Sequence, residues 1–173
     1  MRTIGIHTRV AAFLGAVALL IQIAPALATE RDDHNRPVDI TFTKWGIAAP
    51  PLPAPQPPFG IFDGFSGDLP VGSFVAEVLW RQASVNGHAA GLTAMYEVVD
   101  GDRSFTALIR GGSNAAGLGL LDGVILAGWR TGARVEVMFQ RYGALAGESS
   151  CAGAPVNKTC FVGTIRVGRA PQE

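Results

Sequence analysis

The stretch Leu120–Tyr142, LLDGVILAGWRTGARVEVMFQRY, holds two largely apolar segments on either side of a short polar turn at 129–132. In the second segment Val135, Val137 and Phe139 alternate with polar neighbours, which is the period of a strand with one buried face. This pattern predicts a β-hairpin whose second strand turns those three side chains to the core. The residues Arg134, Glu136 and Gln140 are expected to face outward.

Similar segments recur along the chain at short intervals and are separated by turn sequences such as Asn86-Gly87 and Asp100-Gly101-Asp102. No window has the spacing of an amphipathic helix of useful length. A succession of short strands of this kind predicts an all-β fold, an antiparallel β-barrel of about seven or eight strands, with a sandwich as the alternative. The expected strands cover 39–44, 73–82, 92–99, 104–110, 123–128, 133–142 and 161–167.

A chain of this length could form either an outer-membrane barrel or a water-soluble one. Membrane barrels need lipid-facing apolar stretches of about ten residues and aromatic girdles. Here charged residues interrupt the expected strands, and the favoured interpretation is the water-soluble barrel. The interrupting residues are Arg81, Glu97, Arg134 and Glu136.

Three regions are expected along the chain. Residues 1–28 resemble a signal peptide, with Arg2 and Arg9 before an apolar segment at 10–23 and a small-residue cleavage pattern at 26–28. Residues 29–58 form an N-terminal strand and a proline-rich linker, and residues 59–173 form the barrel domain. The apolar segment is shorter than the roughly 20 residues that a spanning helix needs, so the mature chain is predicted to have no integral membrane span and to be secreted or periplasmic.

Charge and cysteine content narrow the possible partners. Residues 29–173 carry 12 basic and 14 acidic side chains, which gives no basic footprint for nucleic acid. Cys151 and Cys160 are the only cysteines, and in an exported protein they are predicted to form a structural disulfide. Their spacing fits neither a zinc site nor a redox pair, and no metal or cofactor is expected.

Nothing in these patterns predicts an oligomeric state.

No motif predicts a catalytic residue. His88 follows an Asn-Gly turn and is interpreted as a loop residue, and the Asp100–Asp102 pair as a hairpin turn rather than a calcium loop. Glu77 and Glu136 would be functional candidates only if they pointed into the barrel. The aromatic residues Trp80, Tyr96 and Trp129 are of the type that lines ligand pockets as well as cores, and they are the predicted ligand-binding residues.

The segments MYEVVDGDRSFTALIRGG, LLDGVILAGWRTGARVEVMFQ and CFVGTIRV resemble uncharacterised secreted bacterial proteins. The succession of hairpins and glycine-rich segments from about Phe59 to Val167 is loosely similar to the allene oxide cyclase and dirigent-like barrels. This resemblance is architectural, and it implies no catalytic residue here.

Three functions follow as hypotheses. The favoured one is a binding barrel for a small apolar ligand or an envelope component. The second is a cyclase- or isomerase-like enzyme that uses the barrel cavity, which an inward pair of titratable residues would favour. The third is a structural interaction protein of the cell envelope.

Export should cleave the chain after Ala28 and release a protein that begins at Thr29, because the apolar segment is too short to anchor it. Mass spectrometry of exported protein measures this directly. A full-length chain in the membrane fraction would contradict it.

Overall fold

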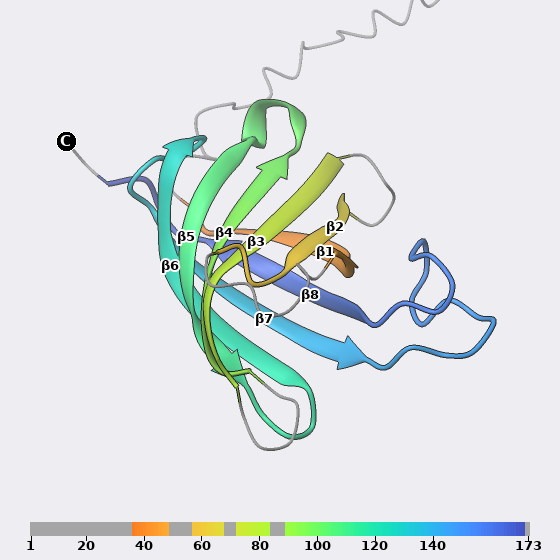
Figure 1. The fold of residues 1–173 in the computed structure, drawn as a ribbon. Helices are drawn as coiled ribbons and strands as arrows, with labels where there is room; N and C mark the ends of the chain where they lie inside the picture. Colours follow the sequence, from red (N-terminus) through yellow and green to blue (C-terminus); the bar gives the residue numbers. More distant parts are fainter. Residues whose placement is uncertain (1–35, 49–56, 68–71, 84–88, 172–173) are drawn as a thin grey trace, which may run out of the picture.

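The computed structural model describes residues 36–48, 57–67, 72–83 and 89–171, and these form a closed, eight-stranded antiparallel barrel (Figure 1). Each strand pairs with its neighbours in sequence, and β8 pairs with β1 to close the sheet. A single short 3-10 turn, Gly101–Arg103, joins β4 to β5. The strands are β1 Val38–Ala48, β2 Ile61–Ser66, β3 Gly72–Ala83, β4 Ala89–Val99, β5 Phe105–Ser113, β6 Leu118–Gly128, β7 Arg134–Tyr142 and β8 Cys160–Val167.

The barrel prediction is confirmed, but the sequence pattern did not predict one of the eight strands. Strand β2 lies in the glycine-rich segment after the prolines, where Gly64 and Ser66 share the inward face with Phe62 and so blur the apolar alternation. Strand β6 also begins at Leu118, five residues earlier than expected, for a similar reason: Gly119 is its first inward residue.

The hairpin of β6 and β7 matches the prediction. Val135, Val137 and Phe139 are buried, and Arg134 and Glu136 are exposed. Glu77 on β3 is likewise exposed, so neither of the two glutamates points into the barrel.

Glycines make room for the large rings inside the barrel. A Cβ on Gly119 would lie 2.1 Å from the ring of Phe139, and one on Gly163 would lie 2.2 Å from the carbonyl oxygen of Met138. Gly163 pairs with both Phe42 and Phe139 on the flanking strands. The close approach of these strands therefore depends on positions without a side chain.

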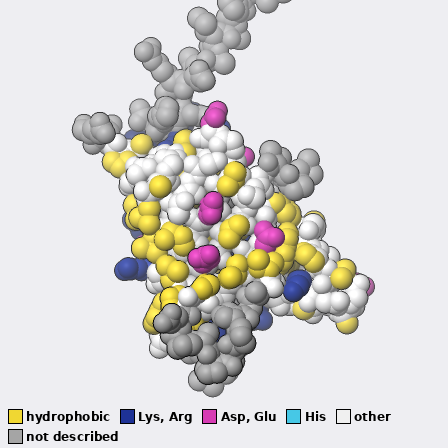
Figure 2. Space-filling view, turned by 45° about the horizontal axis from the view of Figure 1, so that its top comes forward, with side chains coloured by type: hydrophobic (Ala, Val, Ile, Leu, Met, Phe, Trp, Pro, Cys, Tyr) yellow, Lys and Arg dark blue, Asp and Glu magenta, His cyan; other side chains and the backbone are white. Residues whose placement is uncertain are grey.

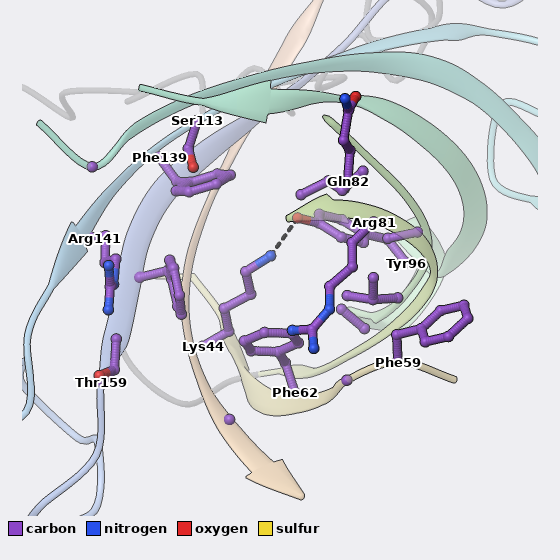
Figure 3. A pocket seen from close by; sticks show the side chains of 18 residues that line it. Lys44, Phe59, Phe62, Arg81, Gln82, Tyr96, Ser113, Phe139, Arg141 and Thr159 are labelled. Carbon is purple, nitrogen blue, oxygen red and sulfur yellow. Dashed lines mark hydrogen bonds between the residues drawn. The ribbon is translucent and has the colours of Figure 1, made fainter. Parts of the chain in front are cut away.

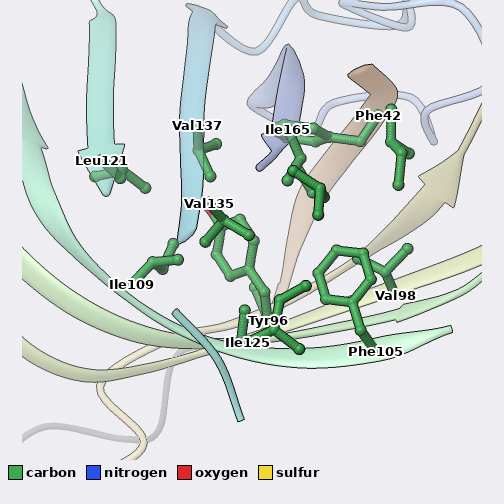
Figure 4. Close-up of a cluster of buried hydrophobic side chains, with 14 of the residues drawn as sticks. Phe42, Tyr96, Val98, Phe105, Ile109, Leu121, Ile125, Val135, Val137 and Ile165 are labelled. Atoms are coloured by element: carbon green, nitrogen blue, oxygen red, sulfur yellow. The ribbon is translucent and has the colours of Figure 1, made fainter. Parts of the chain in front are cut away.

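One end of the barrel is filled. Figure 4 shows the cluster of buried apolar side chains inside the barrel, and Val98, Phe105 and Ile125 are its members at this end. Arg130 lies in the β6–β7 turn of this end, where its Nη1 donates hydrogen bonds of 2.8 Å to the carbonyl oxygens of Arg36 and Gly168. This side chain thus ties together the segments before β1 and after β8.

The opposite end carries the β1–β2, β3–β4, β5–β6 and β7–β8 connections. The last of these is long and leaves one side of the barrel in Figure 1. Cys151 and Cys160 lie at disulfide distance, with Cα atoms 6.3 Å apart, as predicted. Their link ties this connection to the first residue of β8.

The outer surface is mixed in character. Figure 2 shows one face, on which hydrophobic side chains are interspersed with acidic ones. Leu120 and Met138, which pair across β6 and β7, are both more than half exposed. In the described part of the chain, no helix is long and apolar enough to cross a membrane.

Several predictions fall on residues outside the described ranges. These are the signal peptide at 1–28, the proline-rich linker at 50–56 and the loop residue His88.

Replacing Val137 with Asp should unfold the barrel or lower its stability by several kcal/mol, because the carboxylate would be buried without a partner. The matched control is Met138→Asp, since the adjacent side chain is 54% exposed and a surface change costs about 0.5 kcal/mol or less. Thermal unfolding of the two variants measures the difference. Equal losses of stability would contradict the register.

Candidate functional site

A cavity of about 500 Å³ occupies the other end of the barrel and opens between its loops (Figure 3). It exists because Gly46, Ala76 and Ala94 face inward at this level, where the filled end has bulky residues. Most of the wall is apolar, with Phe62, Phe139 and Phe161 among the larger side chains. The barrel is therefore packed at one end and hollow at the other.

Lys44 lies at the base of this cavity. In β1 the residues Ile40, Phe42, Lys44 and Gly46 alternate onto the inward face, so the register that buries the apolar residues also buries the lysine. Only 6% of Lys44 is exposed. Its Nζ and the hydroxyl of Tyr96, which is itself 2% exposed, form a short hydrogen bond, drawn as a dashed line in Figure 3.

Six aromatic rings surround the amine. Its Nζ lies 4.3 Å from the ring centroid of Tyr96 and between 5.2 and 5.8 Å from the centroids of the other five. At such distances a ring face attracts a cation, by up to about 2 kcal/mol where water is excluded. We call this set the aromatic cage: Phe42, Phe62, Phe74, Tyr96, Phe139 and Phe161.

The cage rings also hold one another in place. Phe42 stacks on Phe74 with centroids 5.1 Å apart, and Tyr96 meets Phe74 edge to face at 4.8 Å. Phe161 meets both Phe62 and Phe139 edge to face at 5.5 Å. These are favoured aromatic geometries, so the position of the amine is set by packed neighbours from six strands.

The electrostatics of the site favour a neutral amine. Burial lowers the pKa of Lys44 from its ordinary value of 10.5 to about 7, and burial raises the pKa of Tyr96 well above its usual range. Among the described residues that line the cavity there is no carboxylate, and the charged groups nearest its opening are Arg81 and Arg141. Near neutral pH a substantial fraction of Lys44 is thus an uncharged nucleophile or base, while Tyr96 keeps its proton.

Of the three aromatic residues predicted to bind a ligand, Tyr96 lines the cavity. Trp80 does not, because a bulge between Val78 and Trp80 shifts the inward face of β3 and leaves the indole 51% exposed on the outside. Trp129 packs at the filled end, beside Phe105 and over the guanidinium of Arg130. The structure does not bring the three together.

Sequence reasoning missed Lys44, although two signals pointed to it. The alternation in DITFTK places it on the same face as Ile40 and Phe42. The chain also contains only two lysines, Lys44 and Lys158, against twelve arginines. Lys44 is the last residue of the expected strand 39–44, and no role was predicted for it.

The other candidates are explained by the fold. Asp100 and Asp102 belong to the connection between β4 and β5, as expected for a turn. No group of three or more potential metal ligands occurs among the described residues.

No protein-family model matches the chain, and neither curated proteins nor solved structures give a significant match. The resemblance to allene oxide cyclase and dirigent-like barrels therefore stays a prediction.

The buried amine should make the stability depend on pH in a defined window. The unfolded chain keeps the lysine proton up to about pH 10, whereas the folded chain releases it above about 7, so stability should rise with pH between these values. The expected slope is at most about 1.4 kcal/mol for each pH unit.

The double variant Lys44→Met/Tyr96→Phe removes both polar groups and should lose this rise, while being at least as stable as the parent near pH 6. Denaturant unfolding at several pH values gives the slopes. Parallel pH profiles for the parent and the variant would contradict a neutral buried amine.

Proposed function

We propose that this barrel binds a small, mostly apolar molecule in its hollow end. A volume of about 500 Å³ lies within the range of roughly 300–1,000 Å³ that is typical of ligand pockets. The cavity also has the usual composition of such pockets, with an apolar wall and a few convergent polar groups.

The observation that carries the proposal is the pair of Lys44 and Tyr96 at the base of the cavity. Burying two polar groups among aromatic rings lowers the stability of the fold. Apolar side chains of similar size at these two positions would make the barrel as stable or more stable. Their position suits a ligand whose apolar body fills the cavity and whose oxygen atom accepts hydrogen bonds from this pair.

Export to the periplasm or the cell exterior is part of this proposal. Its supports are the predicted signal peptide and the paired cysteines, since disulfides persist mainly in oxidising compartments. If the cavity takes no ligand, an envelope interaction protein is the remaining hypothesis.

A second candidate function is an isomerase- or cyclase-like enzyme. The specific observation in its favour is that an amine and a phenol hydroxyl meet at the base of the cavity: Lys44 is suited to take a proton from a carbon next to a carbonyl, and Tyr96, which keeps its proton, is suited to donate a hydrogen bond to the carbonyl oxygen. Isomerisation of an unsaturated ketone, followed by absorbance and abolished in Lys44→Met, would favour the enzyme over simple binding.

The neutral fluorescent probe N-phenyl-1-naphthylamine should bind with a Kd in the micromolar range and brighten on entering the cavity. Gly46→Leu should weaken this binding by at least roughly tenfold, since the new side chain points into the cavity. Among the described residues, only Phe62 would lie within 4 Å of a Cβ at Gly46, at 3.9 Å, so the substitution should not strain the fold.

Gly143→Leu is the matched control. This residue lies in the connection after β7, where an added Cβ would meet no atom of the described residues within 4 Å. Equal binding by the two variants, or no binding by the parent, would contradict a ligand site in the cavity.

A further inference from the structure

The amine of Lys44 has unused bonding capacity at the base of a cavity. Its hydrogen bond to Tyr96 is the only one it makes among the described residues, and an amine has further sites for bonding. No described acid lines the cavity to hold it as an ion pair. A lysine placed in this way is a nucleophile that a ligand can reach only from inside the barrel.

We propose that Lys44 holds an aldehyde or ketone ligand covalently, as an imine at the base of the cavity. This inference rests on the proposed function, because the carbonyl compound must first enter the hollow end. It names the chemical class of the ligand, an apolar molecule with a reactive carbonyl group.

The aromatic cage favours a carbonyl over a carboxylate. Six rings surround Nζ with centroids 4.3 to 5.8 Å away, and five of them are phenyl rings that can donate no hydrogen bond to an anion, whose burial there would be costly. A neutral carbonyl group avoids this cost. The protonated imine that it forms is a cation, which the same rings stabilise without a carboxylate counter-ion.

The chemistry needs no group beyond those present. The lone pair of Nζ attacks the carbonyl carbon, a C–N bond forms as the C=O π bond opens, and one of the two amine protons moves to the oxygen to give a carbinolamine. The remaining N–H proton then joins the hydroxyl group, the C–O bond breaks to release water, and the nitrogen lone pair forms the C=N bond, so that amine and carbonyl become imine and water with no change of oxidation state.

Tyr96 is placed to assist both steps. Its hydroxyl already contacts Nζ, so it lies beside the carbon that Nζ would attack and can donate a hydrogen bond to the oxygen on that carbon. Since burial keeps this hydroxyl protonated, it remains a donor throughout.

Reductive trapping tests the inference on the full chain. The protein is incubated with nonanal and sodium cyanoborohydride near pH 7, and adducts are located by intact-mass and peptide mass spectrometry. We expect Lys44 to carry at least roughly tenfold more adduct than Lys158 or the amino terminus, which serve as internal controls for ordinary amines.

Two variants separate site-specific imine formation from other reactions. Gly46→Leu should lower the adduct at Lys44 and leave that at Lys158 unchanged, because it blocks the cavity. Tyr96→Phe should slow the appearance of the adduct at Lys44 by roughly tenfold or more and leave that at Lys158 unchanged.

The outcomes distinguish this inference from the function on which it rests. If the probe binds but nonanal leaves Lys44 unmodified, the imine is wrong and the binding function stands. If neither binds, both fail. Modification of Lys44 that Gly46→Leu does not reduce would also overturn the inference, because the amine would then be reached by another route.

Discussion

The burial of the Lys44 amine within the aromatic cage is the constraint on which the functional end of this barrel depends. The rings come from β1, β2, β3, β4, β7 and β8, and each lies within 6 Å of the same nitrogen. A buried amine without a carboxylate costs free energy unless its surroundings supply attraction or it gives up its proton. Both happen here, since the cage attracts the cation and burial brings the pKa close to 7.

Close packing at the filled end stabilises the fold, whereas the cavity and the buried polar pair at the hollow end cost free energy. There the inward residues are bulky and nearly inaccessible, and Arg130 fastens the segments that flank β1 and β8 by two hydrogen bonds to their carbonyl oxygens. In the hollow end, small inward residues such as Ala76 and Ala94 leave space, and the polar pair stands at its base. This division, with rigidity at one end and an accessible cavity at the other, is suited to a ligand-binding barrel.

How far the sequence predicts this structure differs between fold and site. Strict alternation, as in RVEVMF, places Val135 and Val137 correctly, because successive side chains of a strand point to opposite faces and one placement therefore fixes all the others. The rule fails where it is locally broken: the bulge after Val78 turns Trp80 outward, and glycine at positions 64 and 119 hides inward-facing strand residues. Whether a barrel is hollow depends on the sum of side-chain volumes from all strands at one level, which no single segment reveals.

Direct titration of the two lysine side chains tests the account most closely. With ¹³C-labelled lysine the chain should give only two Cε signals in NMR, because Lys44 and Lys158 are its only lysines, and Lys44→Met assigns them. The account predicts that the Lys44 signal titrates with a pKa of about 7. A Lys44 signal that titrates near the ordinary lysine value of 10.5 would show that the amine is solvated, and would contradict the buried site at the base of the cavity.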